Sequence, residues 1–250
     1  MPENVPENEP EVLPGRGSAP TGGWQTARVL SLTDETPRAK TIRLALEVPT
    51  RQLAGQHYVV RLTAPDGYTA SRSYSVASAP DGSGEIELTV ERLDDGEVST
   101  FLHEVVEPGD ELEVRGPIGG WFVWPGEGRA LLVGGGSGVV PLAAMLRHAR
   151  ALGRPDLVHL VVSVRTPHDL YYRDELLGDG VTVVYTREAP PGSARAPGRL
   201  RVDDLAPFVM PDATAFVCGG TSFCNAATDL LASAGVGVDR IRVERFGPTG

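Results

Sequence analysis

Hydrophobic and polar positions alternate along the first half of the chain. Over 42–48 and 85–91, Ile, Leu and Val occupy alternate positions, a period of two that is typical of strands with one buried face. Similar patterns predict strands over 57–63, 72–76 and 110–115, separated by turns rich in Pro, Asp and Gly. Several short strands at this spacing indicate an antiparallel β-barrel.

The period lengthens in two places. Over 97–106, apolar residues recur at helical spacing, so one helix is expected within the barrel. Beyond Pro125-Gly126-Glu127-Gly128, apolar strands alternate with helices, which predicts a parallel sheet covered on both faces. The expected strands are 130–133, 158–164, 181–185, 213–218 and 240–243. Three helices are expected: one that carries Leu142 and Met145 on one side, one over 201–208 and one over 222–234.

Three segments follow from these patterns. Residues 1–22 are rich in Pro, Glu, Asn and Gly with little to bury, which predicts a disordered tail. Residues 23–125 are expected to form the barrel domain and residues 126–250 the α/β domain. No apolar run reaches the roughly 20 residues of a spanning helix, and the N-terminus has no targeting pattern, so a cytoplasmic protein without a membrane partner is expected.

The net charge of −10 argues against nucleic-acid binding, which needs a concentration of positive charge. Between residues 28 and 61, however, six basic residues stand against three acidic ones. This local excess could steer an acidic protein partner, or it could belong to ordinary solvated strand faces. Adjacent acidic pairs, Asp94-Asp95 and Asp203-Asp204, are expected to be solvated turn residues.

Cysteine and histidine offer little metal chemistry. Two cysteines, Cys218 and Cys224, are too few for a disulfide framework or a four-thiolate iron-sulfur site. The five histidines are single and scattered, so no metal site is expected. Any metal cluster that works with this protein is therefore expected on another chain.

Two short stretches carry the candidate chemistry. The run Gly134-Gly135-Gly136-Ser137-Gly138-Val139-Val140-Pro141 lies between an apolar strand and a helix, where backbone N–H groups and the helix dipole can hold a pyrophosphate. The segment Arg72-Ser73-Tyr74-Ser75 places a charge, a flat ring and hydroxyls on one extended strand. It can bind a cofactor, or it can be an edge strand with a solvated face.

Four motifs in order give a more specific indication. Arg72-x-Tyr74-Ser75, Gly116-Pro117-Ile118-Gly119, Gly136-x-Gly138-x-x-Pro141 and Cys218-Gly219-Gly220 resemble the motifs of the ferredoxin-NADP reductase family, over about residues 24–246. Proline stands where the usual dinucleotide fingerprint has its third glycine. The resemblance implies a flavin-binding antiparallel barrel followed by a nicotinamide-nucleotide domain, with hydride transfer in the cleft between them.

The resemblance also implies roles for individual residues. Arg72 would bind the flavin pyrophosphate, Tyr74 the isoalloxazine or ribityl region, and Ser75 would hydrogen-bond near flavin N5. The start of the barrel's helix would provide the second diphosphate contact, which favours FAD over FMN. Those residues are Gly96, Val98 and Ser99.

On the nucleotide side, the resemblance puts Cys218 beside the nicotinamide, and Glu244 and Phe246 at the border of the flavin ring. The chain continues to Gly250, so Phe246 is not terminal as the shielding aromatic is in some relatives. Arginines just past the ends of parallel strands would bind the adenosine 2′-phosphate, which favours NADPH while leaving NADH possible. These arginines are Arg165, Arg187 and Arg199.

The main hypothesis is therefore a flavoprotein that takes hydride from NADPH onto FAD and passes single electrons to a separate ferredoxin, such as one that serves an oxygenase. Within the same family, the alternative is a reductase that delivers electrons to free flavin, quinone or an oxygenase directly. A third interpretation is a flavin-binding regulatory or electron-transfer subunit without catalytic activity.

Overall fold

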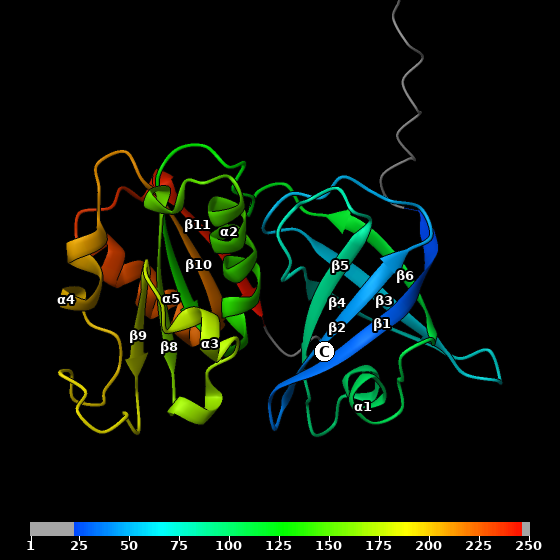
Figure 1. Ribbon diagram of the computed structural model, residues 1–250. Coiled ribbons are helices and arrows are strands. Elements are labelled where there is room, and N and C mark those ends of the chain that lie inside the picture. The colour runs from blue at the N-terminus through cyan, green and yellow to red at the C-terminus, as the bar shows by residue number, and fades with distance from the viewer. Residues whose placement is uncertain (1–22, 247–250) are drawn as a thin grey trace, which may run out of the picture.

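The computed structural model describes residues 23–246, so the predicted tail over 1–22 lies outside the described residues. The chain forms an antiparallel six-stranded sheet followed by a parallel five-stranded sheet with helices on both faces (Figure 1). This confirms the predicted fold class. Within residues 23–246, no helix is both long and apolar enough to cross a membrane.

The first sheet has the strand order β4-β3-β6-β1-β2-β5. Its strands are β1 (Trp24–Thr36), β2 (Ala39–Leu46), β3 (His57–Thr63), β4 (Thr69–Ser75), β5 (Glu85–Glu91) and β6 (Glu111–Ile118). The two outer strands approach each other where Val76, just after β4, pairs with Leu88 of β5, which closes the sheet into a barrel. The alternating apolar residues of β2 and β5 fill its interior, as the period of two predicts.

Helix α1 (Glu97–Glu104) covers one end of the barrel and contacts β4 and β5. Its Val98 and Leu102 are buried in the barrel core. The phenol of Tyr68, just before β4, donates to the carboxylate of Glu97 at 3.3 Å, so the N-terminus of α1 lies next to the start of β4.

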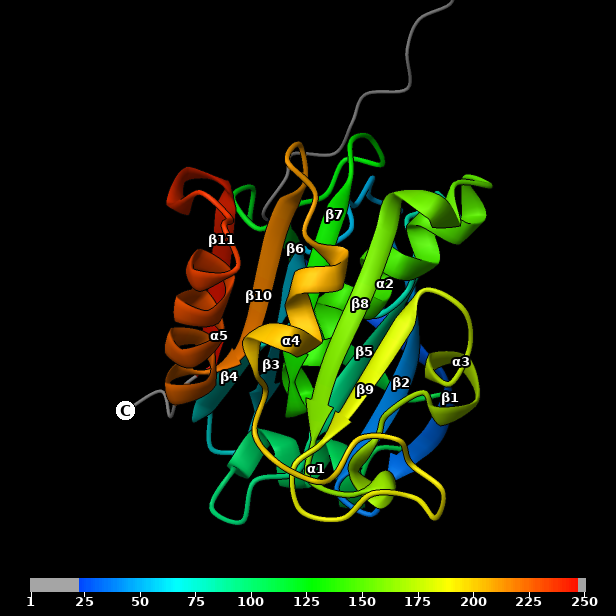
Figure 2. The ribbon, with the colours of Figure 1, turned by 90° about the vertical axis from the view of Figure 1, so that its left-hand side faces the viewer.

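The parallel sheet has the order β11-β10-β7-β8-β9. Its strands are β7 (Ala130–Gly135), β8 (Val158–Val164), β9 (Val181–Tyr185), β10 (Thr214–Gly220) and β11 (Ile241–Phe246). Figure 2 shows α4 (Val202–Leu205) and α5 (Thr221–Ser233) over one face, with α2 (Val139–Ala151) and α3 (Arg173–Leu176) behind the sheet. Strand β7 has no polar side chain, and β8 is apolar except at His159 and Ser163, because both faces of the sheet are covered.

Two helices differ from the sequence prediction. The helix expected over 201–208 is short: α4 ends at Leu205 and a 3-10 turn, η4 (Ala206–Phe208), follows it. Pro207 has no N–H to continue an α-helix, which explains the early end. Helix α3 was not predicted, because four residues are too few to show a period.

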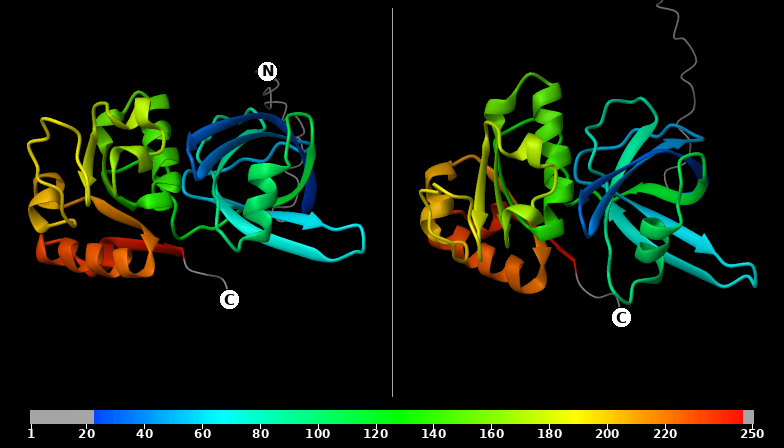
Figure 3. Two further views of the ribbon diagram at one scale, coloured as in Figure 1. Left: turned by 90° about the horizontal axis from the view of Figure 1, so that it is seen from below. Right: turned by 60° about the horizontal axis from the view of Figure 1, so that its bottom comes forward.

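Helix α2 lies between the parallel sheet and the barrel (Figure 3). One hydrophobic cluster joins Met145 and Leu146 of α2 to Ala77 and Trp124 of the barrel side. The helix approaches Gly55 so closely that a Cβ there would lie 2.7 Å from Cε of Met145. The two sheets therefore share a packed interface with α2 at its centre.

Four of the basic residues between 28 and 61 form ion pairs on the barrel surface. Arg28 contacts Glu111 at 3.1 Å and Arg38 contacts Asp94 at 2.9 Å. Arg43 pairs with Glu85 and Arg61 with Glu113. The carboxylates come from other parts of the sequence, so these four arginines meet opposite charges in the fold.

Candidate functional site

Strand β4 is an edge strand of the sheet order, and it presents the candidate residues at different depths. Arg72 pairs across the ladder with Val60, and Tyr74 pairs with Tyr58, so both lie on the side of the strand that carries core residues. Arg72 is nevertheless exposed and donates only to the carbonyl oxygen of Ser71, at 2.8 Å. Among the described residues it has no carboxylate partner, which leaves its guanidinium free for an anion.

Tyr74 is largely buried, and this burial raises the pKa of its phenol, with a smaller opposing effect from the charge of Arg72. The ring therefore stays neutral and supplies an apolar surface. Ser75 ends the strand and is 7% exposed. A charge, a ring and a hydroxyl thus follow one another toward the interface between the sheets.

The N-terminus of α1 lies near this strand. Gly96 is the N-cap, and no side chain in the described part of the chain caps the helix. The hydroxyl of Ser99 donates to the carbonyl oxygen of Gly96 at 3.1 Å and accepts from the backbone N–H of Leu93 at 3.2 Å. Because Ser99 is used in this way and Val98 is buried, these residues can reach a diphosphate only through backbone N–H groups.

The glycine-rich turn joins β7 to α2 through η1 (Gly136–Gly138). Gly136 has φ +57, a conformation that side chains rarely adopt. A Cβ on Gly138 would collide with the carbonyl group of Cys218, so this glycine allows the turn to lie against β10. Ser137 is partly exposed beside Gly136, and Pro141 is buried in the first turn of α2. The turn leaves backbone N–H groups accessible at a helix start.

Cys218 and Glu244 are neighbours in the parallel ladder between β10 and β11, and Cys218 also pairs with Gly134 of β7. Burial raises the pKa of Glu244 from 4.5 to about 7. Its Oε2 atom is buried and has no hydrogen-bond partner within residues 23–246. Burial, followed by the charges of Glu244 and Cys224, also raises the pKa of the Cys218 thiol. The thiol therefore stays protonated and is not a nucleophile.

Phe246 ends β11, where it pairs with Gly220, and it is 36% exposed. Cys224 is buried in α5, and its thiol donates to the carbonyl oxygens of Gly219 and Glu244. Cys224 is thus a core residue, as its sequence context predicts.

The three candidate arginines lie together past the ends of β8 and β9. Arg187 donates its backbone N–H to the carbonyl oxygen of Arg165 at 2.9 Å. The loop before Arg199 comes back to the end of β9, where the backbone N–H of Gly198 donates to the carbonyl oxygen of Tyr185 at 3.0 Å. All three side chains are exposed, and none has a carboxylate partner within residues 23–246. The segments that carry them lie at the edge where parallel sheets bind ligands.

The loop that carries Arg199 is held by a residue that sequence reasoning missed. Arg195 contacts the carboxylate of Asp204 through Nε at 2.6 Å and Nη2 at 2.8 Å, and Nη2 also donates to the carbonyl oxygen of Arg199 at 2.8 Å. The expectation that Asp204 is merely solvated was therefore wrong, because its side chain is only 11% exposed and paired. The nine-residue separation from Arg195 carries no periodic signal.

No group of three or more His, Cys, Asp or Glu side chains among residues 23–246 is arranged to hold a metal ion. The candidate site therefore consists of anion-binding and ring-binding groups on two adjacent sheets.

Family models match both halves of the chain. An oxidoreductase FAD-binding domain matches residues 27–123, and an oxidoreductase NAD-binding domain matches residues 132–229. The chain belongs to the ferredoxin-NADP reductase-like family of FAD- and NAD-binding oxidoreductases. The family that the four motifs indicated is thus confirmed, together with the FAD-binding and nicotinamide-nucleotide-binding domains that it implies.

Two curated relatives illustrate the range of this family. The reductase component of propane 2-monooxygenase from Rhodococcus jostii is 31% identical over 193 residues, covering 72% of this chain and 52% of the relative. Ferredoxin--NADP reductase B from Sorangium cellulosum is 40% identical over 124 residues, covering 49% of this chain and 50% of the relative. The matches thus span about half the length of these relatives.

Among solved structures, a cytochrome P450 reductase from Amycolatopsis has a TM-score of 0.76 at 27% identity, over 92% of this chain and 71% of that one. The residues present fit the two cofactors of the family. Arg72 is free for a diphosphate, the turn around Gly136 admits close backbone approach, and the buried Oε2 of Glu244 lacks a partner.

Proposed function

We propose that this chain takes hydride from NADPH onto FAD and passes single electrons to a separate ferredoxin-type protein of an oxygenase system. The observation that supports this proposal most is the pairing of Cys218 with Glu244. It places a neutral thiol, and a carboxyl group whose Oε2 has no hydrogen-bond partner within residues 23–246, at the sheet edge beside the glycine-rich turn. A propane 2-monooxygenase reductase component and a ferredoxin--NADP reductase among the relatives support the proposed electron acceptor.

On the barrel side, the flavin, when bound, accepts two electrons together and releases them singly. Arg72 would neutralise its diphosphate, aided by backbone N–H groups that open α1 after Gly96. Tyr74 would lie against the ring system, since its phenol is neutral and largely buried. Ser75 would donate or accept a hydrogen bond near flavin N5.

On the nucleotide side, the turn over Gly136, Ser137 and Gly138 would bind the pyrophosphate of NADPH, with Pro141 fixing the start of α2. Cys218 would pack beside the nicotinamide. Glu244, whose pKa is about 7, can hold or release a proton near neutral pH at its unpartnered Oε2. Phe246 would border the flavin ring from the end of β11.

The preference for NADPH rests on Arg165, Arg187 and Arg199. Backbone hydrogen bonds hold the segments that carry them together past the ends of β8 and β9, and all three side chains are exposed. A guanidinium fork can bind a phosphate through two hydrogen bonds. Glu188 is the acidic residue nearest in sequence to Arg187, but it is exposed and follows the strand edge. The adenosine 2′-phosphate would therefore meet an excess of positive charge.

The test begins with the purified protein reconstituted with FAD. It should be yellow and should bleach anaerobically with NADPH faster than with NADH. Cytochrome c reduction should then depend on an added ferredoxin. Failure to retain FAD would reject the flavin assignment, whereas bound FAD that no nucleotide reduces would indicate a regulatory subunit. Ferredoxin-independent reduction of quinone or free flavin would redirect the acceptor assignment.

A further inference from the structure

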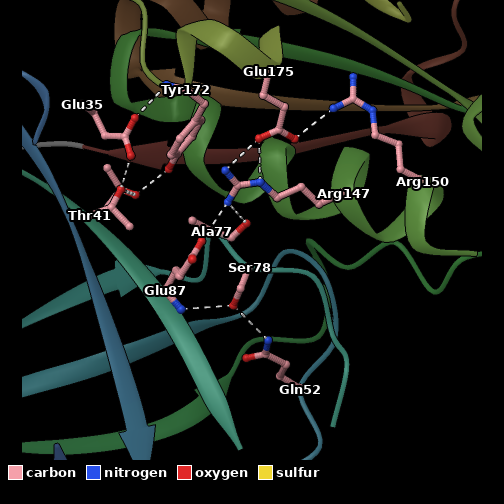
Figure 4. A network of polar contacts seen from close by, with 11 residues as sticks. Glu35, Thr41, Gln52, Ala77, Ser78, Glu87, Arg147, Arg150, Tyr172 and Glu175 are labelled. Carbon is pink, nitrogen blue, oxygen red and sulfur yellow. Dashed lines mark hydrogen bonds and ion pairs between the residues drawn. The ribbon is translucent and has the colours of Figure 1, made fainter. Parts of the chain in front are cut away.

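Arg147, in the middle of α2, connects the two domains through its guanidinium group (Figure 4). Nη1 donates to the carbonyl oxygen of Ala77 at 2.9 Å and to the carboxylate of Glu87 at 3.1 Å, both on the barrel side. Nε donates to the carboxylate of Glu175 at 2.9 Å, on the nucleotide side. The burial of Arg147 opposes its charge, but the hydrogen bond and charge of Glu175 outweigh this and raise its pKa, so the group stays ionised.

Tyr172 forms a second contact beside the first. Its phenol shares a hydrogen bond of 2.5 Å with the hydroxyl of Thr89 in β5, and its backbone N–H donates to the carboxylate of Glu35 in β1 at 3.0 Å. The guanidinium carbon of Arg147 lies 4.5 Å from the centre of the tyrosine ring. Figure 4 shows these side chains converging where the barrel meets α2.

Tyr172 has a left-handed backbone, with φ 50 and ψ 40, and it is the only residue other than glycine with positive φ among residues 23–246. This conformation is unfavourable for a tyrosine and persists where the surroundings hold it. Tyr172 is 6% exposed, so its packing against the barrel holds this conformation. The contact is thus built into the backbone of the nucleotide domain rather than made by a mobile surface side chain.

The two contacts join the elements that carry the candidate cofactor groups. Ala77, which accepts from Arg147, follows Ser75 by two residues at the end of β4. Arg147 lies on the helix that begins immediately after the turn Gly136–Gly138. A single rigid helix therefore runs from the proposed pyrophosphate site to the backbone beside the proposed flavin N5 contact.

We propose that Arg147 and Tyr172 are positioning residues that fix the distance between the nicotinamide and flavin sites. This inference rests on the proposed function. Hydride transfer requires the reacting atoms to approach to about 3–3.5 Å, and a misplacement of about 1 Å can lower the rate about hundredfold. Without Arg147, the carboxylates of Glu87 and Glu175 would also face each other without the cation between them, which would favour separation of the domains.

Arg150 provides a matched control. Its Nη1 contacts the same carboxylate of Glu175 at 2.9 Å, and its Nη2 donates to the carbonyl oxygen of Asp179 at 3.2 Å. All of these groups belong to the nucleotide domain. Arg150→Met therefore removes a cation from Glu175 without breaking a contact to the barrel, whereas Arg147→Met breaks that contact.

The experiment compares the native FAD-loaded protein with Arg147→Met, Arg147→Lys, Tyr172→Phe and Arg150→Met. Anaerobic stopped-flow reduction gives the limiting rate at saturating NADPH and the apparent Kd of the nucleotide. We expect Arg147→Met to lower the limiting rate between tenfold and hundredfold while the Kd values for NADPH and FAD change less than about twofold. Arg147→Lys should recover part of the rate, Tyr172→Phe should lose less, and Arg150→Met should resemble the native protein.

Two measurements on the protein without cofactors separate this inference from the proposed function. Small-angle scattering should give a larger radius of gyration for Arg147→Met than for Arg150→Met, and calorimetry should split one unfolding transition into two. A native limiting rate together with native scattering in Arg147→Met would overturn the positioning role. If no nucleotide reduces the native protein, the proposed function fails, yet scattering and calorimetry still decide whether Arg147 joins the domains. Should Arg147→Met not fold, Arg147→Lys and Tyr172→Phe provide the same comparison.

Discussion

Charged side chains form ion pairs on the outer surface of the barrel, whereas those named here in the candidate cofactor site do not. On the barrel surface, Arg28 lies 3.1 Å from Glu111. Arg61 forms a hydrogen bond with Glu113, and this bond is the main cause of the lowered pKa of that carboxyl group. In the candidate site, Arg72 and Arg187 have no carboxylate partner within residues 23–246, and Glu244 has a buried oxygen without a partner.

We propose that this difference marks groups that are kept for a ligand. A folded chain satisfies nearly all of its buried polar groups, so an unsatisfied one requires an explanation. Groups with perturbed pKa values in clefts are candidates for function for the same reason. On this proposal, the paired arginines serve solubility and local order, whereas the unpaired ones would neutralise phosphate. Four predictions test this division, from the largest expected effect to the smallest.

The largest effect concerns Glu244. Its pKa is raised from 4.5 to about 7 by burial, so the folded chain binds a proton that the unfolded chain releases between these pH values. The free energy of unfolding should therefore fall as pH rises from about 4.5 to 7, by on the order of 3 kcal/mol, and then level off. Urea unfolding of the cofactor-free protein across this range measures the slope, and Glu244→Gln should remove it. An equal slope in the variant would assign the pH dependence to other groups.

The second effect concerns Arg72. Arg72→Ala removes a charge-assisted partner of the flavin diphosphate, which should cost about 1.5–3 kcal/mol in FAD binding. The Kd for FAD should rise about tenfold to hundredfold, as fluorescence titration would measure, and the variant should lose FAD on gel filtration. The control is Arg61→Ala on the neighbouring strand, where the arginine already holds Glu113. Retention of stoichiometric FAD with native affinity in Arg72→Ala would reject the assignment of this motif.

The third effect concerns Arg187. Arg187→Ala should lower kcat/KM for NADPH about tenfold and leave NADH nearly unchanged, because only NADPH carries the 2′-phosphate. The expected loss is at the low end of the range because Arg165 and Arg199 lie beside it and retain part of the charge. Arg154→Ala is the control, since Arg154 is exposed and pairs with Asp156 at 3.4 Å. Equal losses for both nucleotides, or a native preference for NADH, would remove the 2′-phosphate assignment.

Much of the fold follows from short-range patterns. The alternation over 85–91 matches β5, and the glycine-rich run falls between β7 and α2 as expected. These features depend on residues that are neighbours in sequence, where the period and the turn chemistry act directly. The order of the four motifs along the chain then indicated the family, because the fold fixes that order.

The contacts between distant segments were not predictable in this way. The apolar positions of α2 identify a helix, but they do not indicate that Arg147 reaches Ala77, 70 residues earlier. Tyr172 adopts a left-handed conformation for which tyrosine has no intrinsic preference. The sequence predicts that Asp204 is solvated beside Asp203, whereas in the fold the loop places Arg195 in contact with its carboxylate. Each of these contacts depends on tertiary packing rather than on local propensity.

The smallest effect tests the paired side of the comparison. The pair of Arg28 and Glu111 joins β1 to β6, with both side chains about three-fifths exposed, at 61% and 59%. Exposed pairs of this kind contribute about 0.2–1 kcal/mol, because water and salt screen the attraction. A double-mutant cycle with Arg28→Ala and Glu111→Ala, measured by urea unfolding, should give a coupling energy in this range that shrinks at high salt. The Kd for FAD and kcat/KM for NADPH should not change. A loss of FAD in Arg28→Ala would mean that paired surface charges also take part in cofactor binding, and the division between the two regions would then fail.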